Sequence, residues 1–207
     1  ENLRNTPFSL LTGALDKVFY RNKLTAYTKA ALEQTKFEYR VELLLGYGHH
    51  IDYSLTTPWL AQYKRNPTPL HISWEDFEMD GRYRRGFSNL VVLERPDTQG
   101  RTYYDEVISN NTIDLSVHNV TYTTIEKDTI WEIDLKFQKH FTPATSGKIR
   151  IYLSENQIDL KRPVHILVNG QEKFNGRLRP SLKAMAESLS VFYDPERIFP
   201  TYVDITI

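Results

Sequence analysis

The chain has 207 residues, with 26 basic and 26 acidic side chains and a formal net charge of zero. A nucleic-acid binder usually carries a basic excess, so this balance argues against a nucleic-acid partner. The absence of cysteine excludes disulfides and thiolate metal sites. No apolar run reaches the ~18 residues that a membrane span needs, so no membrane-spanning segment is expected.

The first 64 residues predict the order strand, helix, strand. An apolar run at residues 6–12 closes at Gly13, and a second run at residues 37–45 closes at Gly46. Between them Asn22 is a candidate N-cap for a helix that reaches about Gln34. The helical spacing predicts one apolar face made of Leu24, Tyr27, Ala31 and Leu32. This order is the βαβ unit of parallel sheets.

A change of composition follows this unit. Residues 51–63 resemble a short amphipathic helix that is broken at Pro58. Residues 64–69 then contain two prolines within three positions, which is typical of a linker. We therefore expect one domain at residues 1–64 and a second at residues 65–207.

The second domain is expected to be mostly β-structure. The dipeptide Asn169-Gly170 predicts a hairpin, and Pro180 is placed to open a helix at its first turn. The apolar stripe of that helix is Leu182, Met185, Ala186 and Leu189. Candidate strands cover residues 70–74, 87–93, 102–108, 112–117, 131–137, 149–153, 164–168, 172–178 and 201–207. The fold class is thus α+β, with a βαβ piece followed by a β-sandwich-like domain with one packed helix.

Asp16 and His49 are the candidate catalytic residues. Each lies just after one of the two predicted parallel strands, and the carboxyl ends of such strands share one edge. An Asp that orients a His, which in turn deprotonates a hydroxyl, is the triad arrangement of acyl transfer. The plainer alternative is an Asp in a turn and a His in a Gly-rich loop. The nucleophile motif G-x-S-x-G does not occur in the sequence.

The first domain resembles the end of a bacterial α/β-hydrolase of the esterase and peptidase-like type, related to dienelactone hydrolases and prolyl-oligopeptidase-like enzymes. The resemblance implies that Asp16 is the triad acid and His49 the triad base, while His50 is not catalytic. The residues that carry it are Asn2 to Phe8, Gly13, Asp16, Arg21-Asn22, Gly46-Tyr47-Gly48-His49, Pro58-Trp59-Leu60-Ala61 and Arg65-Asn66-Pro67.

The second domain resembles the β-rich C-terminal extension of some of these hydrolases. The residues that carry this likeness are Ile72-Ser73-Trp74, Phe87 to Leu90, Asn111-Thr112-Ile113, Leu153, Asp159 to Val164, Val168-Asn169-Gly170, Phe174-Asn175-Gly176 and Asp194-Pro195. The resemblance implies a C-terminal hydrolase portion whose serine lies in a missing N-terminal half. Such a chain would be inactive alone, would bind that half or self-associate, and would belong to a secreted or periplasmic enzyme.

The alternative is a non-catalytic binding or interaction module that contacts carbohydrate, peptide or a subunit through its β-domain. Trp74, Phe77, Tyr83 and Phe87 would be its sugar platform, although core packing is the commoner use of such aromatics. The acidic residues Glu75, Asp76, Glu78 and Asp80 predict a solvated loop rather than a calcium site. His71, His118, His140 and His165 lack metal-ligand spacing, so no metal and no cofactor is predicted.

Overall fold

The computed structural model describes residues 2–54, 56–76, 86–98, 100–125 and 136–207. The fold is mixed α+β, with most of the ordered structure in strands. The chain divides into two compact units, Glu1–Asn66 and Pro67–Ile207, against the expected division between residues 64 and 65. We describe each unit by itself.

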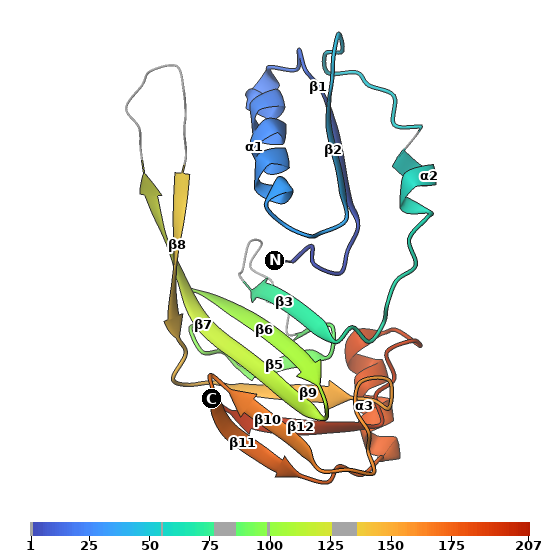
Figure 1. Ribbon diagram of the computed structural model, residues 1–207, viewed down its shortest axis with the longest axis vertical. Helices are drawn as coiled ribbons and strands as arrows, with labels where there is room; N and C mark the ends of the chain where they lie inside the picture. The colour runs from blue at the N-terminus through green and yellow to red at the C-terminus, as the bar shows by residue number, and fades with distance from the viewer. Residues whose placement is uncertain (1, 55, 77–85, 99, 126–135) are drawn as a thin grey trace. The chain divides into compact units, whose positions relative to one another are not determined.

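The N-terminal unit contains a parallel strand pair with a helical crossover (Figure 1). Strand β1 (Phe8–Gly13) pairs with β2 (Tyr39–Leu44) from Phe8 opposite Tyr39 to Gly13 opposite Leu44. The connection is a 3-10 turn, η1 (Val18–Tyr20), followed by helix α1 (Arg21–Glu33). The short helix α2 (Thr56–Leu60) follows β2. Because the two strands end in register, the loops that follow them begin at the same edge.

Helix α1 buries only one of the four residues of the predicted apolar face, Leu32, while Ala31 is exposed. Its buried residues are Thr25 and Leu32, while Leu24 and Tyr27 are exposed. The Thr25 hydroxyl lies 2.8 Å from the Thr12 hydroxyl of β1, so this buried hydrogen bond joins the inward face of the helix to the strand.

Two predicted helix boundaries of this unit are wrong. Residue Tyr20, in a left-handed conformation, precedes the first turn of α1, whereas Asn22 lies within the helix. The Asn22 side chain donates to the Ala14 carbonyl at 3.0 Å, so it fastens the helix to the loop after β1. Helix α2 covers only five residues and includes Pro58, because proline is tolerated in the first turn, where the amide has no partner.

The described part of the C-terminal unit forms two sheets. In the larger sheet the order is β11-β10-β7-β6-β3, and β8 also pairs with β7; in the smaller sheet it is β12-β9-β5-β4. The large-sheet strands are β3 (His71–Asp76), β6 (Arg101–Ser109), β7 (Thr112–Ile125), β8 (Lys136–Pro143), β10 (Val164–Val168) and β11 (Gln171–Gly176). The small-sheet strands are β4 (Gly86–Phe87), β5 (Leu90–Glu94), β9 (Lys148–Leu153) and β12 (Thr201–Thr206).

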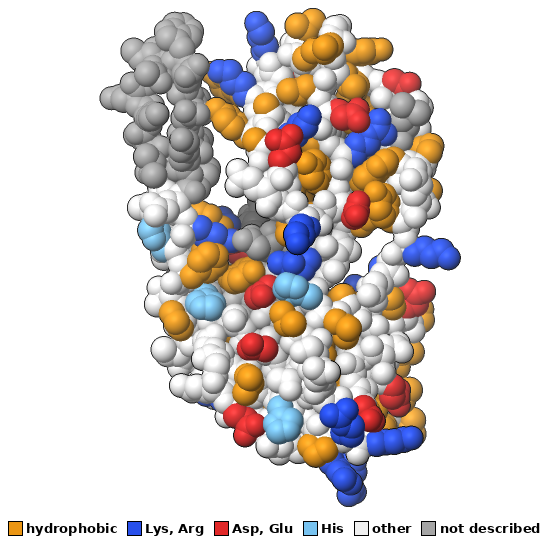
Figure 2. Space-filling model, viewed as in Figure 1, with side chains coloured by type: hydrophobic (Ala, Val, Ile, Leu, Met, Phe, Trp, Pro, Cys, Tyr) orange, Lys and Arg blue, Asp and Glu red, His pale blue; other side chains and the backbone are white. Residues whose placement is uncertain are grey.

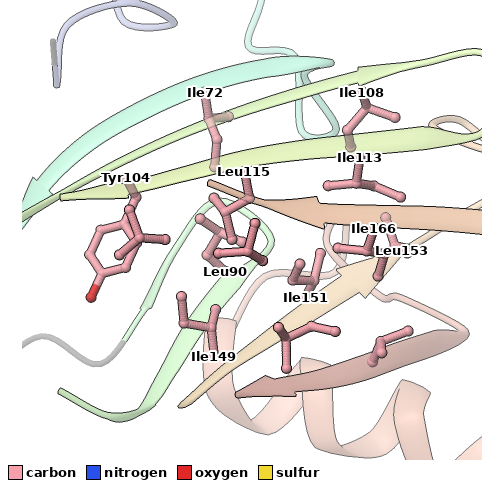
Figure 3. Packing of buried hydrophobic residues seen from close by; sticks show 14 of the residues in the cluster. Ile72, Leu90, Tyr104, Ile108, Ile113, Leu115, Ile149, Ile151, Leu153 and Ile166 are labelled. Atoms are coloured by element: carbon pink, nitrogen blue, oxygen red, sulfur yellow. The ribbon is translucent and has the colours of Figure 1, made fainter. Parts of the chain in front are cut away.

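One hydrophobic core lies between these two sheets (Figure 3). Alternate residues of β6, β7, β9 and β12 point into it, as the period of two predicts. The large sheet contributes Ile72, Ile108, Ile113, Leu115 and Ile166, and the small sheet contributes Leu90, Ile149, Ile151, Leu153, Val203 and Ile205. Both sheets are therefore held by apolar burial on their facing sides.

The tight turns of this unit follow from their residues. Asn169 and Gly170 both have positive φ, 49° and 77°, which confirms the predicted Asn-Gly hairpin between β10 and β11. The expected strand at residues 87–93 is instead the short hairpin β4–β5, because Ser88 takes a left-handed φ of 57°. The predicted strand at 131–137 falls mainly on residues outside the described ranges.

Helix α3 (Leu182–Phe192) begins later and faces differently than predicted. Ser181 is its N-cap, accepting from the Ala184 amide at 3.1 Å, so Pro180 precedes the cap instead of opening the first turn. The helix buries Ala184 and Ser188, and the Ser188 hydroxyl accepts from the Phe199 amide at 2.9 Å. Leu182, at 84 % exposure, and Met185 and Leu189 are on the surface.

No helix in the described residues is long and apolar enough to cross a membrane.

Candidate functional site

Asp16 is held by the turn that follows β1. Its backbone amide donates to the Gly13 carbonyl at 3.0 Å, and its own carbonyl accepts from the Asn22 amide at 3.1 Å. One carboxylate oxygen, Oδ1, accepts from the Val18 amide at 3.2 Å. The backbone of Asp16 is therefore fixed between β1 and α1, and its carboxylate is oriented by the Val18 amide of η1.

His49 is brought to the same edge by a close approach of two backbones. The Leu15 amide donates to the Tyr47 carbonyl at 2.9 Å, which joins the loop after β1 to the loop after β2. A Cβ on Gly13 would lie 2.0 Å from the Gly48 carbonyl oxygen and 2.4 Å from that of Tyr47. Only glycine allows this approach, because the obstructing atoms belong to the backbone.

The two candidate residues are in contact. Nδ1 of His49 lies 3.0 Å from Oδ2 of Asp16. The Asp16 side chain is 4 % exposed and that of His49 is 57 % exposed, so a buried acid supports an accessible imidazole. The hydrogen bond with His49 is the main reason why the pKa of Asp16 is lowered; burial opposes this shift, and the Val18 amide and the Arg21 charge assist it. Asp16 is therefore a carboxylate at neutral pH.

Arg21 is a third member of this site. Its Nη1 lies 2.7 Å from Nδ1 of His49 and 3.6 Å from Oδ2 of Asp16. Arg21 is one of the residues that carry the family likeness, but the sequence predicts no role for it. Its position on the first turn of α1 follows from the left-handed backbone just before that helix, which no spacing in the sequence reveals.

The segment between Asp16 and Arg21 is strained. Phe19 and Tyr20 both have positive φ, 50° and 56°, which costs free energy for residues with a side chain. The Phe19 ring is 78 % exposed, and the Arg21 guanidinium lies 5.6 Å from its centre. Further exposed apolar residues of the same loops are Leu15, Val18, Leu45 and Tyr47. These exposed residues form an apolar rim on the loops that carry the polar site.

The side-chain partners of His49 are Asp16 and Arg21. No described serine is hydrogen-bonded to His49.

Two other groups of residues with a predicted role at the surface are buried instead. Trp74 lies in the core, stacked on Phe87 and Tyr104, so these aromatics do not form a sugar platform; Phe77 and Tyr83 lie outside the described residues. Glu75 and Asp76 are buried in β3 rather than in a solvated loop, and Glu78 and Asp80 lie outside the described residues.

The charge of Glu75 is compensated by neighbouring strands. Its carboxylate is bonded to Arg101 at 3.0 Å, Lys139 at 2.5 Å and the Tyr122 hydroxyl at 2.6 Å. Burial raises the pKa of Glu75, but these three partners together lower it further, so its net shift is downward. Glu75 therefore acts as the anionic centre of an ion cluster.

The histidines of the C-terminal unit lie in separate parts of that unit. In the space-filling view the histidines of the C-terminal unit lie apart from one another (Figure 2). His71 pairs with Asp105 at 3.1 Å, and His165 pairs with Glu172 at 3.0 Å. Among the described residues there is no group of three or more histidine or acidic side chains that could hold a metal ion.

A hollow in the C-terminal unit is lined by Asn110, Asn111 and residues 155–162. Asn111 is used to fix the loop: its side chain accepts from the Asp159 amide at 2.7 Å and donates to the carbonyls of Asp159 and Pro163. Asn111 thus fixes the loop that lines the hollow, and neither Asp16 nor His49 is among the lining residues.

Comparison with family models, with curated proteins and with solved structures found no match to this chain.

Proposed function

We propose that Asp16 and His49 are the acid and base of a Ser-Asp-His triad in a hydrolase that cleaves esters or amides. The observation that carries this proposal is the 3.0 Å contact between buried Asp16 and accessible His49 at the carboxyl edge of a parallel strand pair. In this role Asp16 would hold the Nδ1 proton of His49, and Nε2 would take the proton of the attacking hydroxyl.

The nucleophile of this proposal is a serine outside residues 1–207, on another segment or another chain. The N-terminal unit would then be the βαβ piece of an α/β-hydrolase sheet. The C-terminal unit would be its β-sandwich-like accessory domain, with α3 packed against it. Supporting features are the shared core of the two sheets and the exposed apolar rim beside His49.

The test is ester hydrolysis by the purified assembly that contains this chain together with its nucleophile. His49→Gln and Asp16→Asn should each lower kcat on the order of 10³-fold, because a triad acts as a unit. His50→Gln is the matched control, since His50 is the neighbouring histidine and contacts only the edge of His49, with 5.5 Å between ring centres. Equal activity of the His49 and His50 variants would refute the proposal.

A further inference from the structure

An exposed apolar stripe runs along one side of helix α3. Leu182, Met185, Leu189 and Tyr193, the C-cap, follow one another at steps of three or four residues, which places them on one face of the helix. Their exposed fractions are 84 %, 38 %, 42 % and 87 %. Single exposed apolar residues are normal, but a continuous exposed stripe is typical of an interaction surface.

The side of α3 that faces the C-terminal unit already has its partners. Ala184 and Ser188 are buried, and the Phe192 ring packs against Tyr152 and Phe199. This side anchors the helix to its own unit. The stripe is a second face of the helix, and it stays exposed in the described part of the chain.

The charges at the two ends of α3 are placed against the dipole of the helix. Arg179 and Lys183 are exposed near its N-terminal end, and its first turn contains no acidic residue. Asp194 and Glu196 follow its C-terminal end, and its last turn contains no basic residue. Arg197 pairs with Asp194 at 3.6 Å, which leaves an acidic excess at this end. An isolated helix prefers the opposite distribution, with acids at its N-terminus and bases at its C-terminus.

A second copy of α3 that runs in the opposite direction would match both features. Leu182 and Tyr193 have the same midpoint in the sequence as Met185 and Leu189, to within half a residue. A two-fold axis at this midpoint would set each of these residues opposite an apolar residue of the second copy. The basic end of each helix would lie beside the acidic end of the other, so charges and dipoles would be complementary.

We propose that α3 is a self-association surface, on which two copies of this chain pair their helices side by side in antiparallel orientation. Such an interface uses the same patch on both copies and therefore closes as a dimer. A helix of 11 residues is only about 16 Å long, so the contact is small and the dimer should be weak. This surface goes beyond the proposed hydrolase function and does not depend on it.

Sedimentation velocity of the whole chain, from about 1 µM to about 1 mM, measures the dissociation constant of the dimer. Leu189→Lys places a charge in the stripe and should raise this constant at least about tenfold. Leu93→Lys is the matched control, because Leu93 of β5 is 41 % exposed, compared with 42 % for Leu189, and lies outside the stripe. This control should associate as the wild type does.

Exchanging charges between the two ends of α3 tests the antiparallel orientation. Arg179→Glu and Glu196→Arg should each raise the dissociation constant roughly fivefold, because each brings like charges of the two copies together. Both changes suit the dipole of the helix itself, so a loss of association would not come from a weakened helix. The double variant has opposite charges at the contact again and should regain the wild-type constant.

Three results would overturn this inference. The first is a wild-type chain that remains a monomer over the whole concentration range, which would assign the stripe to a different protein. The second is association that Leu189→Lys and Leu93→Lys change equally. The third is a double charge variant that associates no more tightly than the single variants. None of these measurements depends on hydrolysis, so they succeed or fail separately from the effect of His49→Gln on kcat.

Discussion

Glu106 shows how one residue of the C-terminal unit makes its stability depend on pH. Its side chain lies on the inward side of β6 and is 1 % exposed. Burial raises its pKa to about 7, and the hydrogen bond from Asn89 to Oε1, at 2.8 Å, opposes this only in part. Oε2 has no partner among the described residues. Burying Glu106 therefore costs free energy, and this cost is larger when the carboxyl group is ionised.

The sign of this effect follows from the raised pKa. The folded state holds the Glu106 proton above the pH at which the unfolded chain loses it, so stability falls as the pH rises from about 4.5 to about 7. The loss is about 3 kcal/mol over this range. Glu106→Gln should remove this pH-dependent loss of stability. The stability of the variant relative to the wild type should therefore be higher at pH 8 than at pH 4.5.

Amide hydrogen exchange of β6 and β7, measured at both pH values, checks this prediction. Exposed Glu155→Gln is the control and should follow the wild type at each pH. A Glu106→Gln protein with the same pH dependence as the wild type would show that Glu106 does not carry the effect.

At the scale of elements, Gly13 is the position on which the candidate site depends. Gly13→Ala should separate the end of β1 from the carbonyls of Tyr47 and Gly48, because these backbone atoms cannot move aside independently. We expect a loss of stability of roughly 1–3 kcal/mol or more in the N-terminal unit, together with loss of the Asp16–His49 contact.

Amide exchange in β1 and β2 measures the first effect, and the ¹⁵N chemical shifts of the His49 ring nitrogens measure the second. Gly48→Ala is the matched control, since no atom lies within 4 Å of the Cβ it would add. If both variants behave alike, the close approach at Gly13 does not position the site.

The sequence predicts strands better than it predicts which face of a helix is buried. One side of β9 packs in the core, so its apolar residues Ile149, Ile151 and Leu153 alternate with polar ones. This alternation predicts a strand. In α1 and α3 the periodic apolar residues identify an apolar stripe, but they do not predict which element packs against it. Thr25 and Ser188 are buried instead, since each makes a hydrogen bond to a residue distant in the chain.

The site was predictable only where a general rule applies. Asp16 and His49 follow two parallel strands, and the rule on strand ends places them at one edge. The position of Arg21 depends on the left-handed backbone of Phe19 and Tyr20, for which ordinary residues give no signal. The approach at Gly13 likewise depends on tertiary contact, although the glycine itself marked the end of the strand.

At the scale of the whole molecule, the exposed apolar residues favour association. In the space-filling view apolar side chains lie on the surface of the N-terminal unit among the charged ones (Figure 2). They include Leu24 and Tyr27 of α1 and the rim residues Phe19, Leu45 and Tyr47. A parallel strand pair is normally covered on both faces and continued at its edges. We therefore expect this unit to bind a serine-bearing partner, or to self-associate where that partner is missing.

The most direct test of the central claim is the intact mass and peptide map of the native assembly after reaction with a fluorophosphonate. The reagent modifies a serine only where a base activates it. We predict an assembly heavier than one 24.3 kDa chain, with the label on a serine outside residues 1–207 and lost in His49→Gln but kept in His50→Gln. An unlabelled single chain, or a label that does not depend on His49, would contradict the account.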